Sequence, residues 1–320
     1  MNKQQSTADN FNRGVTFLML GVTAGLALDI VAKKLLEEFS VAQFIFFRSV
    51  FGVLAFLIVA KWYGGIASLK TKRWKWHLFR SVLAIGAMFG FFFGLSRMPL
   101  VNTLTIVFVA PLIVTALSVP FLKEQVGWRR WIAVIYGFIG VIIVLRPSPN
   151  MFTLPAISLL LSACCWAGLA VTARKLSATE SSFSLAFYVT AAPLFVSLFL
   201  LPNNFLIPNS MDWILFILAG IFSALAWIGI VGGYRLASPV VLAPFEYTGL
   251  VGAAIAGYLI WDEVPDKWVI IGGFIIISGG IYIVFREVGG TPFNRYIRGF
   301  SAAASATIQR RLKRIVKKHN

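Results

Sequence analysis

Long apolar runs alternate along this chain with short polar segments. Ten runs can each form a helix long enough to cross a bilayer core of roughly 30 Å. They cover residues 14–34, 42–60, 78–96, 100–121, 128–145, 153–174, 183–201, 212–234, 239–260 and 268–285. In hydrocarbon every backbone polar group must be satisfied within its own segment, so we expect all ten runs to be helical. The pattern predicts an all-α integral membrane protein, with antiparallel neighbouring helices because the connections are short.

The chain contains two related halves. The stretch Arg97–Pro147 returns in altered form about 139 residues later, so that Glu124 corresponds to Glu263. A repeat of this length indicates a duplicated structural unit. Because each half has five spans, an odd number, the second half must enter the membrane in the opposite orientation. We therefore predict a cytoplasmic N-terminus at 1–13, two inverted five-helix repeats at 14–147 and 148–287, and a basic cytoplasmic tail at 288–320.

Charge placement gives the orientation. The chain is 58% hydrophobic and 13% charged, well below the roughly one quarter charged that soluble domains carry. With the N-terminus inside, all but six of the 29 basic residues lie on the cytoplasmic side. The exceptions are Lys33, Lys34, Arg97, Arg146 and Lys267 outside, and Arg48 within a span. The positive-inside rule therefore predicts that both termini are cytoplasmic. The net charge of +17 lies between apolar spans, so we do not expect nucleic-acid binding.

The tail differs in composition from the rest of the chain. Within TIQRRLKRIVKK, residues 307–318, the apolar positions share one side of a helix and the other positions are basic. Such a helix favours the anionic lipids of the cytoplasmic leaflet. The alternative is a disordered, solvated tail.

Several segments resemble one family of transporters. FVAPLIV at 108–114, FLKEQVGWRRWIAVIYGFIGVIIVLRP at 121–147 and the run from PFEY at 244–247 are similar to the drug/metabolite transporter superfamily, EamA type. LDIVAKKL, FIFFRSVFG and PFEY are similar to bacterial members associated with S-adenosylmethionine or riboflavin uptake. The resemblance covers roughly residues 14 to 287. It implies an EamA-like fold of ten helices around a cavity, in a monomer or homodimer of the bacterial inner membrane, and transport without ATP.

Two charged residues within the first two spans are candidate substrate contacts, because charge inside a membrane usually faces a cavity or a partner. Asp29 shares a helical face with Gly21, Gly25 and Lys33. Arg48 lies at a matching depth, so the two could pair or share a zwitterionic substrate. The alternatives are an Asp29–Lys33 pair that stabilises a helix end and an Arg48 that anchors the helix at the interface. The resemblance supports both positions as functional.

Glu246 is the most specific candidate for a substrate-binding or coupling residue. It stands where the first copy has Val107, and a carboxylate at this depth costs at least about 2.5 kcal/mol unless it is paired or protonated. We predict that it binds the cationic part of the substrate or carries a coupling proton. The alternative is a buried structural hydrogen bond. Further candidate contacts, which could equally be packing residues, are Tyr247, Trp166, Trp227, Tyr136 and Asn102.

The sequence lacks the motifs that ATP binding, metal binding and common enzymatic mechanisms require. The chain has no GxxxxGK[ST] loop, so we do not expect it to use ATP. It has two histidines, His77 and His319, and two adjacent cysteines, so we expect no metal site, no cofactor and no enzymatic activity. The pattern favours a secondary-active transporter of a small organic metabolite that works by alternating access, with proton coupling or exchange. The alternatives are a passive metabolite channel and, less favoured, a membrane enzyme that uses Asp29 and Glu246 as acid and base.

Overall fold

In the part of the chain that the structure describes, the secondary-structure elements are α-helices. The computed structural model describes residues 3–60, 69–122, 128–145, 153–176, 179–201, 205–236 and 245–288. The first half contains α1 (Lys3–Leu35), α2 (Val41–Val59), α3 (Trp74–Leu95), α4 (Leu100–Val107), α5 (Ala110–Leu122) and α6 (Trp128–Leu145). The second half contains α7 (Leu154–Leu176), α8 (Ser182–Phe199), α9 (Ser210–Leu236), α11 (Thr248–Trp261) and α12 (Lys267–Val288). The predicted all-α class is confirmed.

The lengths of the apolar segments fit a membrane protein. Five are long and apolar enough to cross a bilayer, within Asn12–Leu35, Val41–Ile58, Trp74–Leu95, Leu154–Ala173 and Ser210–Ile230. Shorter apolar helices occupy the other five predicted positions, at Leu100–Val114, Val134–Val144, Phe183–Phe199, Thr248–Trp261 and Lys267–Gly279. The helix predicted at 14–34 begins earlier, at Lys3. No proline or glycine interrupts residues 3–13, so the helix extends backward from its apolar part.

One predicted helix is broken. We expected a continuous helix over 100–121, but α4 ends at Val107 and α5 begins at Ala110. The break has a local cause, because Pro111 has no backbone N–H to donate to the carbonyl of Val107. Just before Pro111 the backbone forms a tighter turn, in which the Val109 N–H donates to the Ile106 carbonyl three residues back at 3.2 Å. In the second half α11 begins at Thr248, and residues 239–244 of the helix predicted at 239–260 lie outside the described part.

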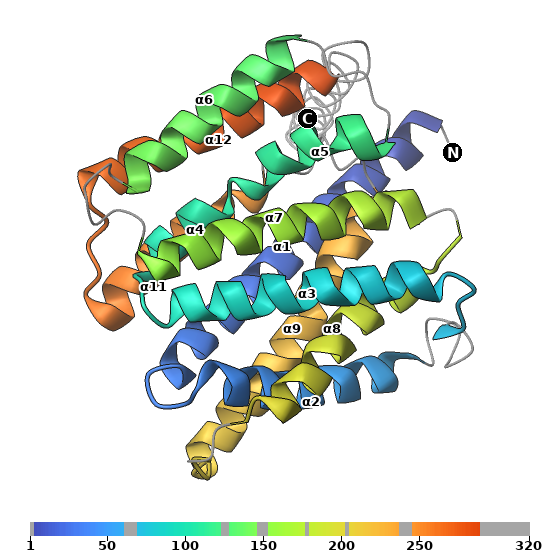
Figure 1. Cartoon of the computed structure of the whole chain (residues 1–320). Coiled ribbons are helices and arrows are strands. Elements are labelled where there is room, and N and C mark those ends of the chain that lie inside the picture. The colour runs from blue at the N-terminus through green and yellow to red at the C-terminus, as the bar shows by residue number, and fades with distance from the viewer. Residues whose placement is uncertain are drawn as a thin grey trace, which may run out of the picture.

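Packing follows the repeat. Helix α1 packs along α9, and their counterparts in the other half, α7 and α3, pack along each other (Figure 1). The pairs α2 with α8 and α6 with α12 join equivalent helices, and Figure 1 shows α6 and α12 side by side. This exchange of partners is what a two-fold relation between the halves requires. Their opposite orientation in a membrane stays a prediction.

Glycines set the closeness of these helix pairs, as their spacing predicts. A Cβ added at Gly21 of α1 would lie 2.6 Å from the backbone nitrogen of Ile230 in α9. A Cβ added at Gly90 of α3 would lie 2.7 Å from the carbonyl oxygen of Ser158 in α7. Real Cβ contacts are longer, so each crossing depends on its glycine. The long helices are thereby fixed against one another around the polar residues described next.

Candidate functional site

The two halves meet at their helix breaks. Phe108, at the break between α4 and α5, and Tyr247, directly before α11, occupy equivalent positions in the repeat. Their rings pack with centroids 5.3 Å apart at an interplanar angle of 50°. Interrupted membrane helices free backbone polar groups and are tolerated where they line a cavity or are covered by protein. The crossing of α4 and α11 is therefore where the repeat brings irregular backbone from both halves together.

Glu246 lies at this crossing. It is half-buried and directly precedes Tyr247, whose side chain is buried with 7% of its surface exposed. Along α11 the buried face continues through Gly249, Ala253 and Gly257, the helical face that its sequence predicts. Asn102, half-buried on α4, belongs to the other helix of the crossing. Glu246, Tyr247 and Asn102 thus all lie on the two broken segments.

Arg48 is buried among three helices. It lies on α2 with 4% of its surface exposed. Its Nη2 donates to Ser223 Oγ of α9 at 2.7 Å, and its Nη1 lies 3.2 Å from Met88 Sδ of α3. The guanidinium also lies over the Phe92 ring at 5.5 Å from the centroid. Arg48 therefore does not act as an interfacial anchor, and that alternative is wrong.

Asp29 interacts electrostatically with Arg48 across the interior between α1 and α2. The alternative pair of Asp29 with Lys33 is wrong, because Lys33 Nζ contacts the Glu263 carboxylate and donates to the Met98 carbonyl at 3.3 Å. Lys33 points away from Asp29 because Glu263 and the connection between α3 and α4 lie beside the end of α1. Arg48 is thus buried, whereas Asp29 is half-buried and interacts with it electrostatically.

Aromatic candidates divide into two groups. Trp166 of α7 and Trp227 of α9 are partly buried against the main core, with ring centroids 5.8 Å apart and an interplanar angle of 34°. Trp227 follows Ser223 by one helical turn, which brings this pair near Arg48. Tyr136 of α6 is 44% exposed, and among the described residues no contact joins it to the other candidates.

A second polar cluster closes the outer ends of three helices, on the predicted external side. Besides Lys33, Glu263 receives the Leu100 N–H at 2.8 Å, at the start of α4. Asp262 ends α11 in the left-handed conformation (φ 53°), and the Glu263 N–H donates to the Gly257 carbonyl at 3.0 Å. This helix-capping turn directs Glu263 back toward α1 and α4. The sequence pattern had led us to treat these loop charges as signals of orientation, so it missed this contact.

Beside it, Glu37 in the α1–α2 connection accepts hydrogen bonds from Lys34 and from Trp261 Nε1, the latter at 2.6 Å. The Lys34 ammonium, followed by the Trp261 indole, lowers the pKa of the Glu37 carboxyl below its ordinary value. The Glu37 carboxylate therefore stays charged at neutral pH.

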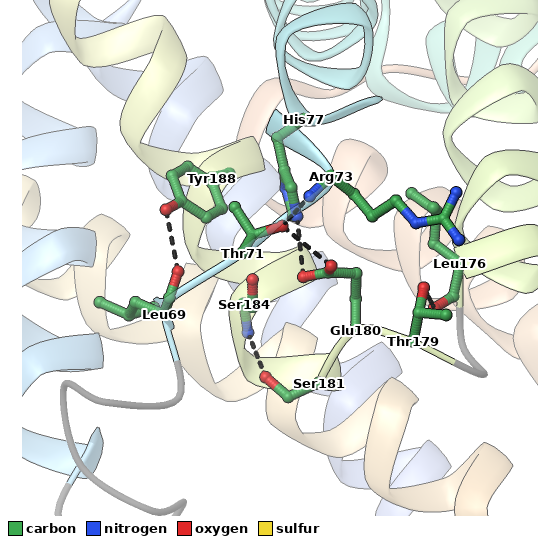
Figure 2. Close-up of polar contacts among 10 residues, drawn as sticks. All are labelled: Leu69, Thr71, Arg73, His77, Leu176, Thr179, Glu180, Ser181, Ser184 and Tyr188. Carbon is green, nitrogen blue, oxygen red and sulfur yellow. Dashed lines mark hydrogen bonds and ion pairs between the residues drawn. The ribbon is translucent and has the colours of Figure 1, made fainter. Parts of the chain in front are cut away.

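On the predicted cytoplasmic side, two connections are held together by a buried histidine and glutamate (Figure 2). His77 Nε2 of α3 lies 3.2 Å from Glu180 Oε2 in the α7–α8 connection, and Thr71 donates to Glu180 Oε1 at 2.8 Å. Figure 2 also shows the Tyr188 hydroxyl donating to the Leu69 carbonyl, at 3.0 Å. One turn beyond His77, buried Arg80 donates to the Leu169 carbonyl of α7 at 2.6 Å. We missed these residues because they stand at the cytoplasmic end of a span, where basic residues are ordinary.

The comparisons with known proteins agree with this geometry. The model of the EamA-like transporter family matches residues 12–146 and again 153–286. This chain belongs to the EamA-like transporter family. The members of this family are transporters rather than enzymes, and this chain is a transporter of the same family.

Three curated relatives illustrate the range of the family. The S-adenosylmethionine uptake transporter of Rickettsia bellii is 31% identical over 87% of this chain and 95% of its own. The riboflavin transporter of Vibrio cholerae is 29% identical over 83% and 92%. The pseudopaline exporter CntI of Pseudomonas aeruginosa is 26% identical over 88% and 99%. A solved crystal structure shares the fold, with a TM-score of 0.62 at 16% identity over 87% of this chain and 99% of that one.

Proposed function

We propose that this chain is a secondary-active carrier of a small organic metabolite that works by alternating access. The observation that carries the proposal is the contact between Phe108 and Tyr247, which joins the helix breaks of the two copies. Carriers built from repeats place substrate and coupling sites at discontinuous helices near the repeat interface. A signalling or structural membrane protein has no need of such a crossing.

Glu246 is the proposed coupling residue. It stands at the break of the second copy, where the first copy has an apolar valine, so the two halves differ in charge at the point where they cross. A carboxylate there can bind the cationic part of a substrate or exchange a proton between the two sides. Coupling to a proton gradient, or exchange of one metabolite for another, follows from this role.

We propose a cargo that is S-adenosylmethionine-like, riboflavin-like or amino-acid-like, and the names of the relatives support a small organic metabolite. The relatives include both uptake proteins and an exporter, so the direction of transport has to be measured. Their bacterial sources support a place in the bacterial inner membrane, with both termini cytoplasmic according to the charge pattern. The basic tail lies outside the described residues, and its binding to anionic lipids stays a prediction.

Purified protein in liposomes tests the proposal. Uptake of S-adenosylmethionine, riboflavin and amino acids would be measured with and without a proton gradient. A carrier gives saturable uptake and counter-flow when the liposomes are preloaded with substrate. Flux that never saturates and shows no counter-flow would identify a passive channel instead.

A further inference from the structure

Among the residues that the structure describes, no anion contacts the buried cation Arg48. Arginine carries five N–H donors, yet the described hydrogen-bond partners of this side chain are a neutral hydroxyl and a thioether sulfur, which is a weak acceptor, and its remaining described contact is the face of the Phe92 ring. Its Nε is buried and has no hydrogen-bond partner. Leaving a buried guanidinium without a counter-charge is costly. A bound anion that reaches Nε and the remaining donors would complete the site.

Asp29 supplies the negative charge that complements Arg48 in this site. It feels the charge of Arg48, but within the described part of the chain no ion pair or hydrogen bond joins the two residues. Lys33, the nearest lysine on its own helical face, is held by Glu263 on the external side. Half-buried Asp29 and buried Arg48 therefore interact electrostatically without a described contact between them. A ligand that carries both charges can bridge them.

We infer that this pair binds the α-amino acid group of the transported metabolite, with Arg48 donating to its carboxylate and Asp29 accepting from its ammonium. The inference rests on the proposed carrier function and narrows its substrate class. An α-amino acid group bears both charges on one carbon and is neutral overall, so it can satisfy both residues without adding net charge to the interior. The planar fork of arginine matches a carboxylate better than lysine does.

The aromatic pair lies next to this site. Ser223 accepts the hydrogen bond from Arg48, and Trp227 lies one turn after Ser223 on α9. The Trp227 ring packs against the Trp166 ring. A flat heteroaromatic group attached to the amino acid can stack on these rings. The site therefore favours an α-amino acid that bears a flat ring. S-adenosylmethionine has both parts, a simple amino acid has one, and riboflavin has the ring without the amino acid group.

A ligand series on the unaltered protein in liposomes gives the first test. S-adenosylmethionine would compete with its decarboxylated form, with methylthioadenosine, which keeps the ring alone, and with riboflavin. Loss of the carboxylate should weaken competition by about tenfold to a hundredfold, because the site is then left with an unpaired buried group. If the decarboxylated form competes as well as its parent, the inference is wrong.

Variants give the second test. Arg48→Gln should weaken binding of the parent and abolish its advantage over the decarboxylated form, while Arg48→Lys should retain part of that advantage. Arg97→Gln, at an exposed arginine on the outer end of α3, is the matched control and should leave the ratio unchanged. Retained binding of methylthioadenosine shows that the variants are folded.

The outcomes separate this inference from the proposed function. If the unaltered protein carries no metabolite of a broad panel, the carrier function itself is wrong. If it carries riboflavin with saturation and does not discriminate by the α-amino acid group, the carrier function stands and the role of Asp29 and Arg48 is overturned. If the Arg48→Gln variant still prefers the parent over the decarboxylated form, Arg48 does not bind the carboxylate.

Discussion

Glu263 binds Lys33 through one carboxylate oxygen and the Leu100 N–H through the other, at 2.8 Å. These contacts join the ends of α1, α4 and α11 on the predicted external side. The side chains of Lys33 and Glu263 are 10% and 18% exposed, so the pair is largely shielded from water. In the proposed alternating-access carrier, opening of that side to a substrate would require this contact to break.

Glu263→Gln should therefore loosen the external closure. Removing one partner of a buried ion pair costs up to about 3 kcal/mol, so thermal unfolding in detergent should shift to lower temperature. Lys34→Gln is the matched control, because Lys34 pairs with Glu37 at 56% and 39% exposure, where water screens the pair, and the change should leave thermal unfolding almost unaltered. A double exchange, Lys33→Glu with Glu263→Lys, should not restore stability, since a lysine cannot accept the Leu100 N–H. Full recovery by the exchange would contradict the described geometry.

Gly21 and Gly25 should respond differently to the same change. A Cβ at Gly21 meets backbone atoms of α9 at 2.6 to 3.0 Å, whereas one at Gly25 has the Ala226 Cβ at 3.9 Å as its nearest neighbour. Gly21→Ala should destabilise the protein by about 1 to 3 kcal/mol through overpacking. Gly25→Ala should be neutral or stabilising by up to about 1 kcal/mol, because alanine favours the helix. Equal melting temperatures for the two variants would show that α1 and α9 do not cross at Gly21.

Pro111 should matter for transport more than for folding. Pro111→Ala supplies an N–H for the Val107 carbonyl and allows α4 and α5 to join into one helix. We expect unchanged or higher thermal stability together with slower uptake, because the straightened helix no longer presents its break to Tyr247. Pro193→Ala, in the interior of α8, is the control. Uptake that is unaffected by Pro111→Ala would remove the break from the mechanism.

Glu246→Gln tests the coupling role. The side chain keeps its shape and loses its charge, so uptake should fall by about tenfold or more, which corresponds to about 1.4 kcal/mol. The pH dependence of the remaining uptake should flatten. Glu37→Gln, an exposed carboxylate of the outer surface, should leave both properties unchanged. Full activity of the Glu246→Gln variant with the original pH profile would reduce this residue to a structural role.

The pattern of apolar runs predicted most of the architecture, including α6 at its observed bounds of Trp128–Leu145. It placed Gly21 and Gly25 on one helix face, and Gly21 lies at the crossing with α9. It did not predict the break after Val107, since hydropathy is continuous through it. It also placed Asp29 beside Lys33, where the structure pairs Lys33 with a residue 230 positions away. Arg80 and the His77–Glu180 contact were missed for a similar reason, because their partners belong to other helices.

By itself the sequence determined that the chain is a duplicated bundle of membrane helices, because hydrophobic length and backbone hydrogen bonding admit little else in a bilayer. It also marked Asp29, Arg48 and Glu246, because charge within an apolar run is conspicuous. Only the tertiary structure decided which charges touch and which do not. Lys33 forms an ion pair with Glu263, and Arg48 contacts Ser223 and Met88. Asp29 interacts with Arg48 electrostatically. The physical reason is that partners in a helical bundle are chosen by how helices from the two halves cross, and that information is spread over the whole fold.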